Sequence, residues 1–395
     1  MAKPEIRLKG FEGEWIPKTI GAIANVIGGG TPSTVVDNYW NGNIQWFTPS
    51  EVGKSRYVSR SERTISKEGL EKSSAQMLPA NSILLSSRAT VGECSINTRE
   101  CCTNQGFQSL VPKKVELDFL YSLISTIKKD MIRESSGSTF LEISANKVRD
   151  LNVFIPDIDE QKSLGDYFKS LDSLIHATTR KIVSLKQMKS ASLISFFPQN
   201  GESRPRVRFK GFEGKWVYSQ LGDIFLERIE SNIHGEMLSV TMNDGIIKAS
   251  ENGRFDNSNS DKSKYKVVKI NDIAYNSMRM WQGASGCSQY EGIVSPAYTV
   301  VMPVDGIDSK FFSYMFKTLP MIKLFRLHSQ GLTSDTWNLK YPAFSKIKVL
   351  YPKDIIEQQK IASFFTSLDK QISLQEQRLE KLKQIKSACL DKMFV

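Results

Sequence analysis

The segment Pro4-Glu-Ile-Arg-Leu-Lys-Gly-Phe-Glu-Gly-Glu-Trp15 returns as Pro205-Arg-Val-Arg-Phe-Lys-Gly-Phe-Glu-Gly-Lys-Trp216, with 8 of 12 positions identical. A second repeat lies downstream of each copy. Glu160-Gln161 and Phe168-Lys-Ser-Leu-Asp172 match Glu357-Gln358 and Phe365-Thr-Ser-Leu-Asp369. The stretches between these repeats show no comparable similarity. The chain is therefore a duplicated frame that carries two diverged inserts, which predicts one architecture used on two different targets.

Length and charge restrict the class of protein. At 395 residues the chain exceeds an ordinary single domain, and its repeat is far longer than the roughly 20–50 residues of a solenoid unit. We expect two globular units, each able to bury a core. The formal net charge of +11 favours a polyanionic partner. Because basic residues are spread over both halves, the charge indicates two basic faces rather than one basic tail.

The cysteines and the N-terminal sequence indicate a reducing, intracellular setting. The five cysteines are an odd number with no Cys-x-x-Cys spacing, so neither a disulfide framework nor a zinc site is predicted. The first residues lack the apolar core of a signal peptide, and there is no run of about 18 apolar residues. The sequence thus predicts a cytoplasmic protein without a membrane segment.

Two long helices are predicted from apolar residues that alternate four and three positions apart, a spacing of about 3.5 residues. Each helix begins with an Asp three residues before a Glu, at Asp157 and Asp354, which is the pattern of a helix N-cap. The predicted boundaries are 1–156 for the first module, 157–198 for the first helix, 199–352 for the second module and 353–395 for the second helix. Matched polar positions, such as Lys189 and Lys386, favour an antiparallel pair. The alternative is ordinary core packing within one domain.

Both inserts have a mixed α/β pattern that ends in a helix and a short strand before the long helix. The predicted strands in the inserts are 83–85, 92–96, 109–111 and 151–155 in the first, and 266–270, 273–275, 298–302 and 347–351 in the second. The predicted helices are 118–132 and 311–327, the latter broken by Pro320. The fold class is therefore α/β, with two globular α/β modules separated by two long helices that pack as an antiparallel coiled coil with a pseudo-twofold internal repeat.

Motifs for catalysis are missing from the sequence. There is no Gly-x-x-x-x-Gly-Lys-Ser/Thr phosphate loop, no Asn/Asp-Pro-Pro-Tyr/Phe motif of adenine methylation, and no Gly-x-Gly cofactor loop after a strand. The three histidines are not spaced for a metal ion. These observations favour a binding protein with no catalytic residue and no metal site.

Several local motifs accompany this order of elements. They include Gly29-Gly-Thr-Pro-Ser33, Ser87-Arg-Ala-Thr-Val-Gly92, Asn104-Gln-Gly106, Tyr275-Asn-Ser-Met-Arg-Met-Trp-Gln-Gly283 and Gly292-Ile-Val-Ser-Pro-Ala-Tyr298. In this order and with these motifs, the chain resembles the specificity subunit of type I restriction-modification systems. The resemblance implies a non-catalytic subunit that binds a bipartite, asymmetric double-stranded DNA site, with one half-site for each target recognition domain. It also implies that the chain docks two modification subunits, which use S-adenosylmethionine to methylate adenine at N6, and restriction subunits, which use ATP and Mg²⁺.

Residues for DNA contact follow from the chemistry of base and phosphate recognition, in which Arg, Asn and Gln read base edges while basic and hydroxyl groups hold phosphates. For the first half-site we predict Arg88, Thr90, Asn104, Gln105, Lys54, Arg56 and Ser138. For the second half-site we predict Asn276, Arg279, Trp281, Gln282, Ser295, Tyr298 and Thr333.

Subunit docking is predicted for the repeated pairs Glu160, Gln161, Glu357 and Gln358, although helix capping would also explain the two glutamates. Two alternatives for the whole chain remain open at this point. One is a non-catalytic two-headed scaffold protein, and the other is an inactive specificity allele.

Overall fold

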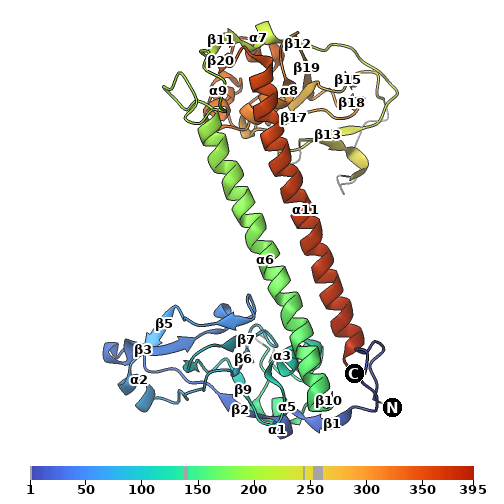
Figure 1. Cartoon of the computed structure of the whole chain (residues 1–395). Helices are drawn as coiled ribbons and strands as arrows, with labels where there is room; N and C mark the ends of the chain where they lie inside the picture. The colour runs from blue at the N-terminus through green and yellow to red at the C-terminus, as the bar shows by residue number, and fades with distance from the viewer. Residues whose placement is uncertain (1, 138–140, 243–244, 252–260) are drawn as a thin grey trace. The chain divides into compact units, whose positions relative to one another are not determined.

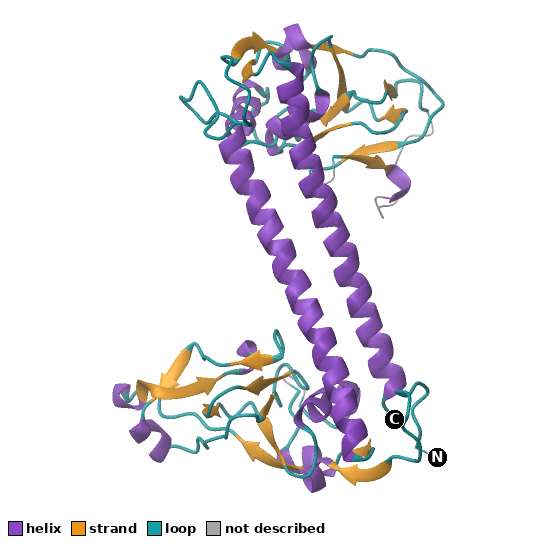
Figure 2. Ribbon diagram, viewed as in Figure 1, coloured by secondary structure: helices purple, strands orange, loops and turns teal. Residues whose placement is uncertain are grey.

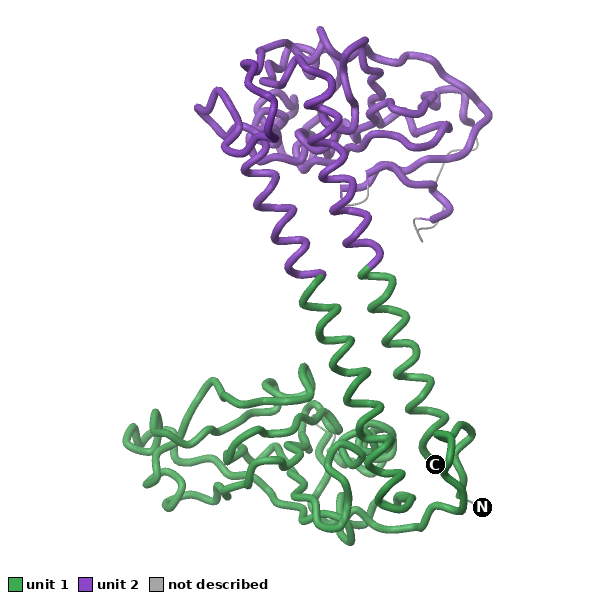
Figure 3. The backbone as a smooth tube through the Cα atoms, in the orientation of Figure 1, with its two compact units in different colours: residues 1–181, 375–395 green, residues 182–374 purple. Residues whose placement is uncertain are grey.

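The computed structural model describes residues 2–137, 141–242, 245–251 and 261–395 (Figure 1). The chain forms two compact units (Figure 3). Unit 1 contains residues 1–181 and 375–395, and unit 2 contains residues 182–374. Each unit therefore combines one insert with a part of both long helices.

The two long helices are α6 (Ile158–Phe196) and α11 (Ile355–Met393), each 39 residues long (Figure 2). Their first turns are capped as predicted, since the Oδ1 atoms of Asp157 and Asp354 accept backbone N–H bonds of 2.9 and 2.8 Å. Within each unit the helix segments are antiparallel. In unit 1 Asp172 pairs with Lys386 at 2.6 Å, and in unit 2 Lys189 pairs with Asp369 at 2.5 Å. These two ion pairs join positions that are equivalent by the sequence repeat.

In unit 1 the frame begins with an antiparallel pair of strands that connects the start of the insert to its end. This pair joins β1 (Ile16–Thr19) and β10 (Asn152–Ile155). A five-stranded sheet follows, with the order β2 (Ala24–Gly28), β9 (Gln108–Pro112), β6 (Ile83–Leu85), β7 (Cys94–Asn97) and β4 (Tyr57–Val58). A three-stranded sheet has the order β5 (Arg63–Ile65), β3 (Trp40–Phe47) and β8 (Cys101–Thr103).

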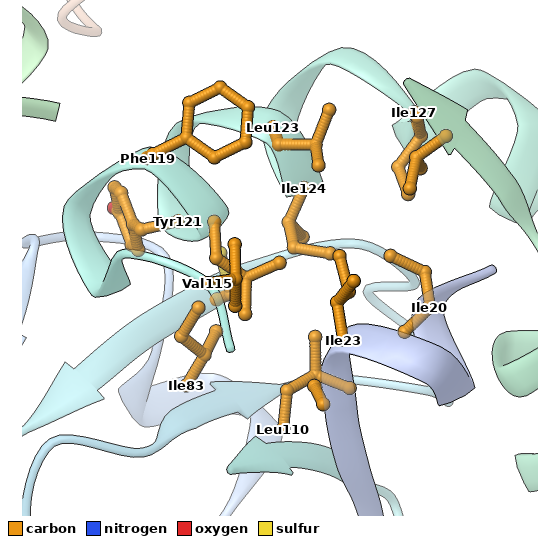
Figure 4. Close-up of a cluster of buried hydrophobic side chains, with 14 of the residues drawn as sticks. Ile20, Ile23, Ile83, Leu110, Val115, Phe119, Tyr121, Leu123, Ile124 and Ile127 are labelled. Carbon is orange, nitrogen blue, oxygen red and sulfur yellow. The ribbon is translucent and has the colours of Figure 1, made fainter. Parts of the chain in front are cut away.

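The helices of the first insert are α1 (Ile20–Ile23), α2 (Lys67–Glu71), α3 (Leu117–Thr126), α4 (Lys128–Arg133) and α5 (Ala145–Asp150). The single helix predicted over 118–132 is two helices, because Ile127 has φ −89° and ψ 8° and interrupts the ladder. The Ile127 side chain nevertheless joins the core with Phe119, Ile83 and Leu110, where α3 covers the sheet (Figure 4).

Unit 2 repeats the connecting strand pair with β11 (Val217–Gln220) and β20 (Lys348–Tyr351). Its main sheet has the order β12 (Phe225–Glu227), β19 (Tyr298–Pro303), β16 (Ile273–Asn276) and β17 (Ser285–Cys287). Two small sheets pair β13 (Leu238–Val240) with β14 (Ile246–Lys248), and β15 (Lys266–Val268) with β18 (Gly292–Val294). The helices are α7 (Leu221–Ile224), α8 (Ser309–Met315), α9 (Leu319–His328) and α10 (Tyr341–Phe344).

The two inserts share one topology despite their different sequences. The order β2-β9-β6-β7 in unit 1 corresponds to β12-β19-β16-β17 in unit 2. In both units the neighbouring strands of this order are antiparallel, and a pair of helices follows the second strand in the order. The prediction of two α/β modules with two long antiparallel helices is thus confirmed. The units differ in their additional strands, which in unit 1 are β4 at the edge of this sheet and the three-stranded sheet, and in unit 2 the two small sheets.

The repeated sequence is explained by a contact that each unit makes once. Arg7 binds Glu160 through two bonds of 2.8 and 2.6 Å, and Arg208 binds Glu357 through bonds of 2.6 and 2.7 Å. Each arginine also donates to a glycine carbonyl, Gly13 or Gly214, at 2.6 Å. The hydrogen bonds to the glutamates raise the pKa of both arginines. The first repeat therefore attaches the entry of each module to the start of a long helix.

Candidate nucleic-acid interface

Each unit presents three loops that meet at one edge of its main sheet. The exit loop follows β6 or β16 and comprises 86–92 in unit 1 and 276–283 in unit 2. The entry loop precedes β9 or β19 and comprises 104–107 and 295–298. The hairpin lies between the helix pair and α5 or α10, over residues 135–142 and 330–338, and in unit 1 residues 138–140 of it lie outside the described residues.

The same backbone hydrogen bonds join these loops in both units. Ser87 N–H donates to Gly106 O at 2.8 Å, and Ser87 O accepts from Ile143 N–H at 3.0 Å. In unit 2 Ser277 N–H donates to Ala297 O at 3.3 Å, and Ser277 O accepts from Leu339 N–H at 2.8 Å. Each hairpin is closed by a bridge, Ser136 with Glu142 and Gln330 with Asn338. The three loops are therefore equivalent by geometry and not by sequence.

In unit 1 the exit loop holds the predicted residues Arg88 and Thr90. Arg88 is half exposed and forms an ion pair of 3.0 Å with Glu142 of the hairpin. Thr90 Oγ1 lies 2.9 Å from Ser86 Oγ. Between them Ala89 has φ +63°, a conformation that is uncommon for a residue with a Cβ atom. The bonds to neighbouring loops hold this strained turn in place and direct the Arg88 guanidinium to the surface.

The entry loop of unit 1 holds Asn104 and Gln105 against the glycine-rich segment 28–33. Thr31 Oγ1 donates to Gln105 Oε1, and Asn104 Oδ1 accepts from Gly106 N–H at 2.9 Å. A Cβ atom on Gly29 would lie 2.0 Å from Asn104 O, so this approach requires glycine. The glycine-rich segment thus supports the entry loop, and Thr31 is a neighbour of Gln105 that sequence reasoning did not select.

In unit 2 the exit loop holds Asn276, Arg279, Trp281 and Gln282. Asn276 Oδ1 accepts from Met278 N–H at 3.0 Å, which turns the chain so that Arg279 and Gln282 are exposed. Trp281 is partly exposed and packs edge to face on Trp337 of the hairpin, with 5.2 Å between ring centroids. Arg326 stacks over Trp337, with its Cζ atom 5.0 Å from the ring centroid.

The remaining predicted residues of unit 2 lie on the other two loops. Ser295 accepts from Ala297 N–H, and its carbonyl accepts from Tyr298 N–H, so the entry loop is a tight turn. Thr333 caps the end of the hairpin through bonds with Thr336. A cavity of about 360 Å³ opens where the three loops meet, and Met278, Ala297, Asn338 and Tyr341 are among its lining residues.

Some of the predicted site residues lie elsewhere. Arg56 is buried and binds Asp118 at 2.8 Å and Asp172 at 2.6 Å, so its side chain is directed into unit 1 and away from the surface. The prediction that Arg56 contacts DNA does not fit this burial, because the carboxylates of Asp118 and Asp172 pair with its guanidinium inside the unit. Lys54 is exposed but lies outside the three loops, and Ser138 lies outside the described residues.

The four residues predicted to dock other subunits are buried and have internal partners. Glu160 and Glu357 bind the arginines described above. Gln161 and Gln358 accept from the backbone N–H groups of Glu116 and Asp308 at 3.0 and 2.8 Å, and donate to Pro156 O and Pro352 O at 2.9 Å. The structure gives these side chains a role inside each unit, at the junction of module and long helix, and none of them reaches the surface.

Within the described part of the chain, no group of three or more His, Cys, Asp and Glu side chains is arranged to hold a metal ion. Burial raises the pKa of the Cys94 and Cys101 thiols to about 12 and that of Cys102 to about 11. These thiols are protonated at neutral pH and serve as core residues.

A comparison with family models shows two matches in this chain. The model described as "Type I restriction modification DNA specificity domain" matches residues 12–187 and 213–384. The chain belongs to this family. Each match covers one module and most of the long helix that follows it, so the internal repeat is a repeat of the family's domain.

Individual relatives are similar over part of their length. The specificity subunit of the type I restriction enzyme MjaIX from Methanocaldococcus jannaschii is 35% identical over 167 residues, which cover 41% of this chain and 39% of the relative. The EcoR124I/EcoR124II specificity subunit from Escherichia coli is 28% identical over 182 residues, 44% of each chain. The chain thus spans less than half the length of these curated relatives.

Solved structures share the fold over the whole chain. The S subunit of a type I restriction-modification system from M. genitalium has a TM-score of 0.63 at 16% identity, with 100% of this chain and 99% of that chain covered. A chain from a structure described as "complex assembly and conformational transition of the type I R-M system" has a TM-score of 0.52 at 13% identity, with 96% and 97% covered. Among the described residues there is no helix with the length and apolar character needed to cross a membrane.

Proposed function

We propose that this chain is the DNA specificity subunit of a type I restriction-modification complex. It binds a bipartite, asymmetric duplex DNA site, and each module reads one half-site through its three loops. The observation that carries this proposal is the edge of the main sheet where the three loops meet, because the same backbone hydrogen bonds join these loops in both units while the side chains differ. Such an arrangement suits two different base sequences read by one framework.

The chain acts without catalysis of its own and binds no cofactor. Two modification subunits supply adenine N6 methylation with S-adenosylmethionine, and restriction subunits use ATP and Mg²⁺. Support comes from the family match and from the fold that the chain shares with a subunit of an assembled type I complex. Because such a complex acts on chromosomal DNA, the proposed location is the cytoplasm.

The net charge of +11 supplies the sequence-independent part of DNA binding. Exposed Arg88 and Arg279 supply paired N–H donors of the kind that bind guanine O6 and N7 in the major groove. Asn104 and Gln105 on the entry loop of unit 1, and Asn276 and Gln282 on the exit loop of unit 2, carry the amides that suit adenine. The loops thus combine both contact types that a specific DNA interface requires.

The test is to express the chain with its modification subunit in a host without adenine methylation, and to map N6-methyladenine by single-molecule sequencing. The proposal predicts a split, asymmetric motif with methylation on both strands. The purified complex should bind a duplex with this motif, and its affinity should fall by at least tenfold between 50 and 200 mM salt as counterions are released. A duplex with both half-sites scrambled is the control. A stable complex that neither methylates a motif nor prefers this duplex would contradict the proposal and favour a scaffold protein.

A further inference from the structure

One pair of positions differs between the two three-loop edges in a way that has consequences for base recognition. Ser87 and Ser277 are equivalent, because each bonds the entry loop through N–H and the segment after the hairpin through its carbonyl. The next residue is Arg88 in unit 1 and Met278 in unit 2. The residue that closes the hairpin is Glu142 in unit 1 and Asn338 in unit 2.

In unit 1 this pair of positions holds an ion pair at the surface. Arg88 Nη2 lies 3.0 Å from Glu142 Oε2, and the two side chains are 49% and 40% exposed. An arginine has five N–H donors, and among the described residues only Glu142 pairs with the Arg88 guanidinium, so further donors can serve a ligand. The pair thus presents a fork of donors beside a carboxylate acceptor. In the major groove a G·C pair offers the complementary set, since guanine has acceptors at O6 and N7 and cytosine has an amino donor at N4.

In unit 2 the same positions hold an apolar side chain and an amide. Met278 is 45% exposed, and Asn338 lines the cavity of about 360 Å³ that takes the place of the ion pair. Asn338 Oδ1 is shielded from solvent and has no hydrogen-bond partner among the described residues. A small turn of the amide toward the cavity would give this oxygen a donor from an entering base.

An A·T pair complements this second arrangement. Adenine presents N7 as an acceptor and N6 as an amino donor, which an asparagine amide binds in a bidentate manner. Thymine presents a C5 methyl group, which makes apolar contact with a side chain such as methionine. Lys266 and Lys340 also line the cavity and place positive charge near the phosphates of an entering strand.

We propose that these equivalent positions are specificity determinants, and that Arg88 with Glu142 reads a G·C pair in the first half-site whereas Met278 with Asn338 reads an A·T pair in the second. This inference rests on the proposed function. It adds Glu142, Met278 and Asn338 to the residues that contact bases. It also states which base pair each module reads at the corresponding position.

The experiment exchanges the two pairs and maps methylation. The variant Arg88→Met with Glu142→Asn should convert one G·C position of the first half-site to A·T and leave the second half-site unchanged. The reciprocal variant, Met278→Arg with Asn338→Glu, should convert one A·T position of the second half-site to G·C. Val35→Ala and Leu319→Ala alter exposed apolar side chains that lie outside the three loops of unit 1 and unit 2, and they are the controls, with both half-sites unchanged.

Single, conservative variants provide a second measurement if a double variant does not fold. Glu142→Gln should lower the preference for G·C over other pairs at that position by about tenfold in competition binding, because a carboxylate acceptor is lost. Asn338→Asp should lower the preference for adenine by a similar factor, because the amide donor to N7 is lost. Circular dichroism and recovery of the intact complex verify that these variants fold.

The outcomes separate this inference from the proposed function. If the wild-type complex methylates no motif, the proposed function fails. If it methylates a split motif but the exchanged variants keep the same bases, the inference fails while the proposed function holds. Loss of all methylation by an intact variant complex would also overturn the inference, because the pair would then serve binding in general and not the choice of a base pair.

Discussion

Each module attaches to a long helix through an aspartate of that helix. The two aspartates occupy equivalent positions of the repeat but have different partners in the two modules. In unit 1 Asp172 accepts from Arg56 at 2.6 Å, and Arg56 also binds Asp118 and stacks over Tyr121 at 4.3 Å. In unit 2 the equivalent Asp369 accepts from the Tyr314 hydroxyl at 2.9 Å. The repeated long helix therefore keeps an aspartate as hydrogen-bond acceptor. The module supplies the donor, which is a charged arginine in unit 1 and a neutral tyrosine hydroxyl in unit 2. A module can therefore diverge in sequence as long as it supplies a hydrogen-bond donor to this aspartate.

The charged junction of unit 1 has a specific electrostatic character. Burial alone would lower the pKa of Arg56, but hydrogen bonds with Asp118 and Asp172 outweigh burial and raise it. Burial would likewise raise the pKa of Asp118, but hydrogen bonds from Lys169 and Arg56 hold it below its usual value. Both groups therefore stay ionised in the folded state at neutral pH.

The largest effect is expected where the two units are the same. Glu160→Gln and Glu357→Gln should each destabilise their own unit by about 3 kcal/mol, because each leaves an arginine without its buried counter-charge. Urea unfolding followed by circular dichroism measures this loss. Similar losses of unfolding free energy for the two variants would support the equivalence of the two frames. A difference above about 2 kcal/mol would contradict this equivalence. Glu71→Gln, which removes an exposed helix pair with Lys67, is the control and should leave stability unchanged within error.

The next effect distinguishes the two junctions. Asp118→Asn should destabilise unit 1 by about 2 kcal/mol or more, since it removes a carboxylate that Arg56 and Lys169 share. Tyr314→Phe removes from unit 2 a neutral hydroxyl, which bonds Asp369 and more weakly Thr366, and should cost about 1 kcal/mol. The same unfolding assay compares them. A larger loss for Tyr314→Phe would show that the neutral junction is the stronger one.

Acid should weaken the charged junction. Because the folded pKa of Asp118 lies below its unfolded value, its contribution is fully present above about pH 4 and is lost as pH falls through the folded pKa. The stability difference between wild type and Asp118→Asn should therefore shrink between pH 6 and pH 3. An unchanged difference over this range would show that the substitution acts through packing and not through charge.

The smallest effect concerns the repeated ion pairs between the long helices. Lys189→Met and Lys386→Met each remove one partly exposed partner of an aspartate, and each should cost about 1 kcal/mol or less. Lys386→Met should cost the smaller amount, because Asp172 keeps Arg56 whereas Asp369 keeps only a tyrosine hydroxyl among its described partners. The reverse order in thermal unfolding would contradict this reading of the two junctions.

Much of the architecture could be predicted from the sequence, because it depends on patterns that are local or repeated. The spacing of apolar residues predicted the long helices, and their first turns begin at Asp157 and Asp354. The motifs around Arg88, Asn104 and Asn276 were selected from the sequence, and the structure places Arg88 and Asn276 on equivalent exit loops and Asn104 on an entry loop. Glycine and short polar side chains mark such turns strongly.

The remaining features depend on contacts between distant segments. Arg56 is part of a basic stretch in the sequence, and only the arrival of Asp118 and Asp172 from other elements buries it. The equivalence of Glu142 with Asn338 follows from hairpin bridges in segments with no shared sequence. The internal bonds of Glu160 and Gln161 likewise require Arg7 and Glu116, which lie far away along the chain. Residue type and local spacing carry no signal for such pairings.

If the three loops of each unit read their own half-site, changes in the loops of one unit should alter only that half-site. This is tested by mapping N6-methyladenine for the wild-type complex and for the single variants Arg88→Ala and Arg279→Ala, each co-expressed with the modification subunit. We expect a split motif for the wild type, relaxed bases in one half-site for Arg88→Ala, and relaxed bases in the other half-site for Arg279→Ala. This expectation would be contradicted if both variants relaxed the same half-site, or if neither changed any base of the motif.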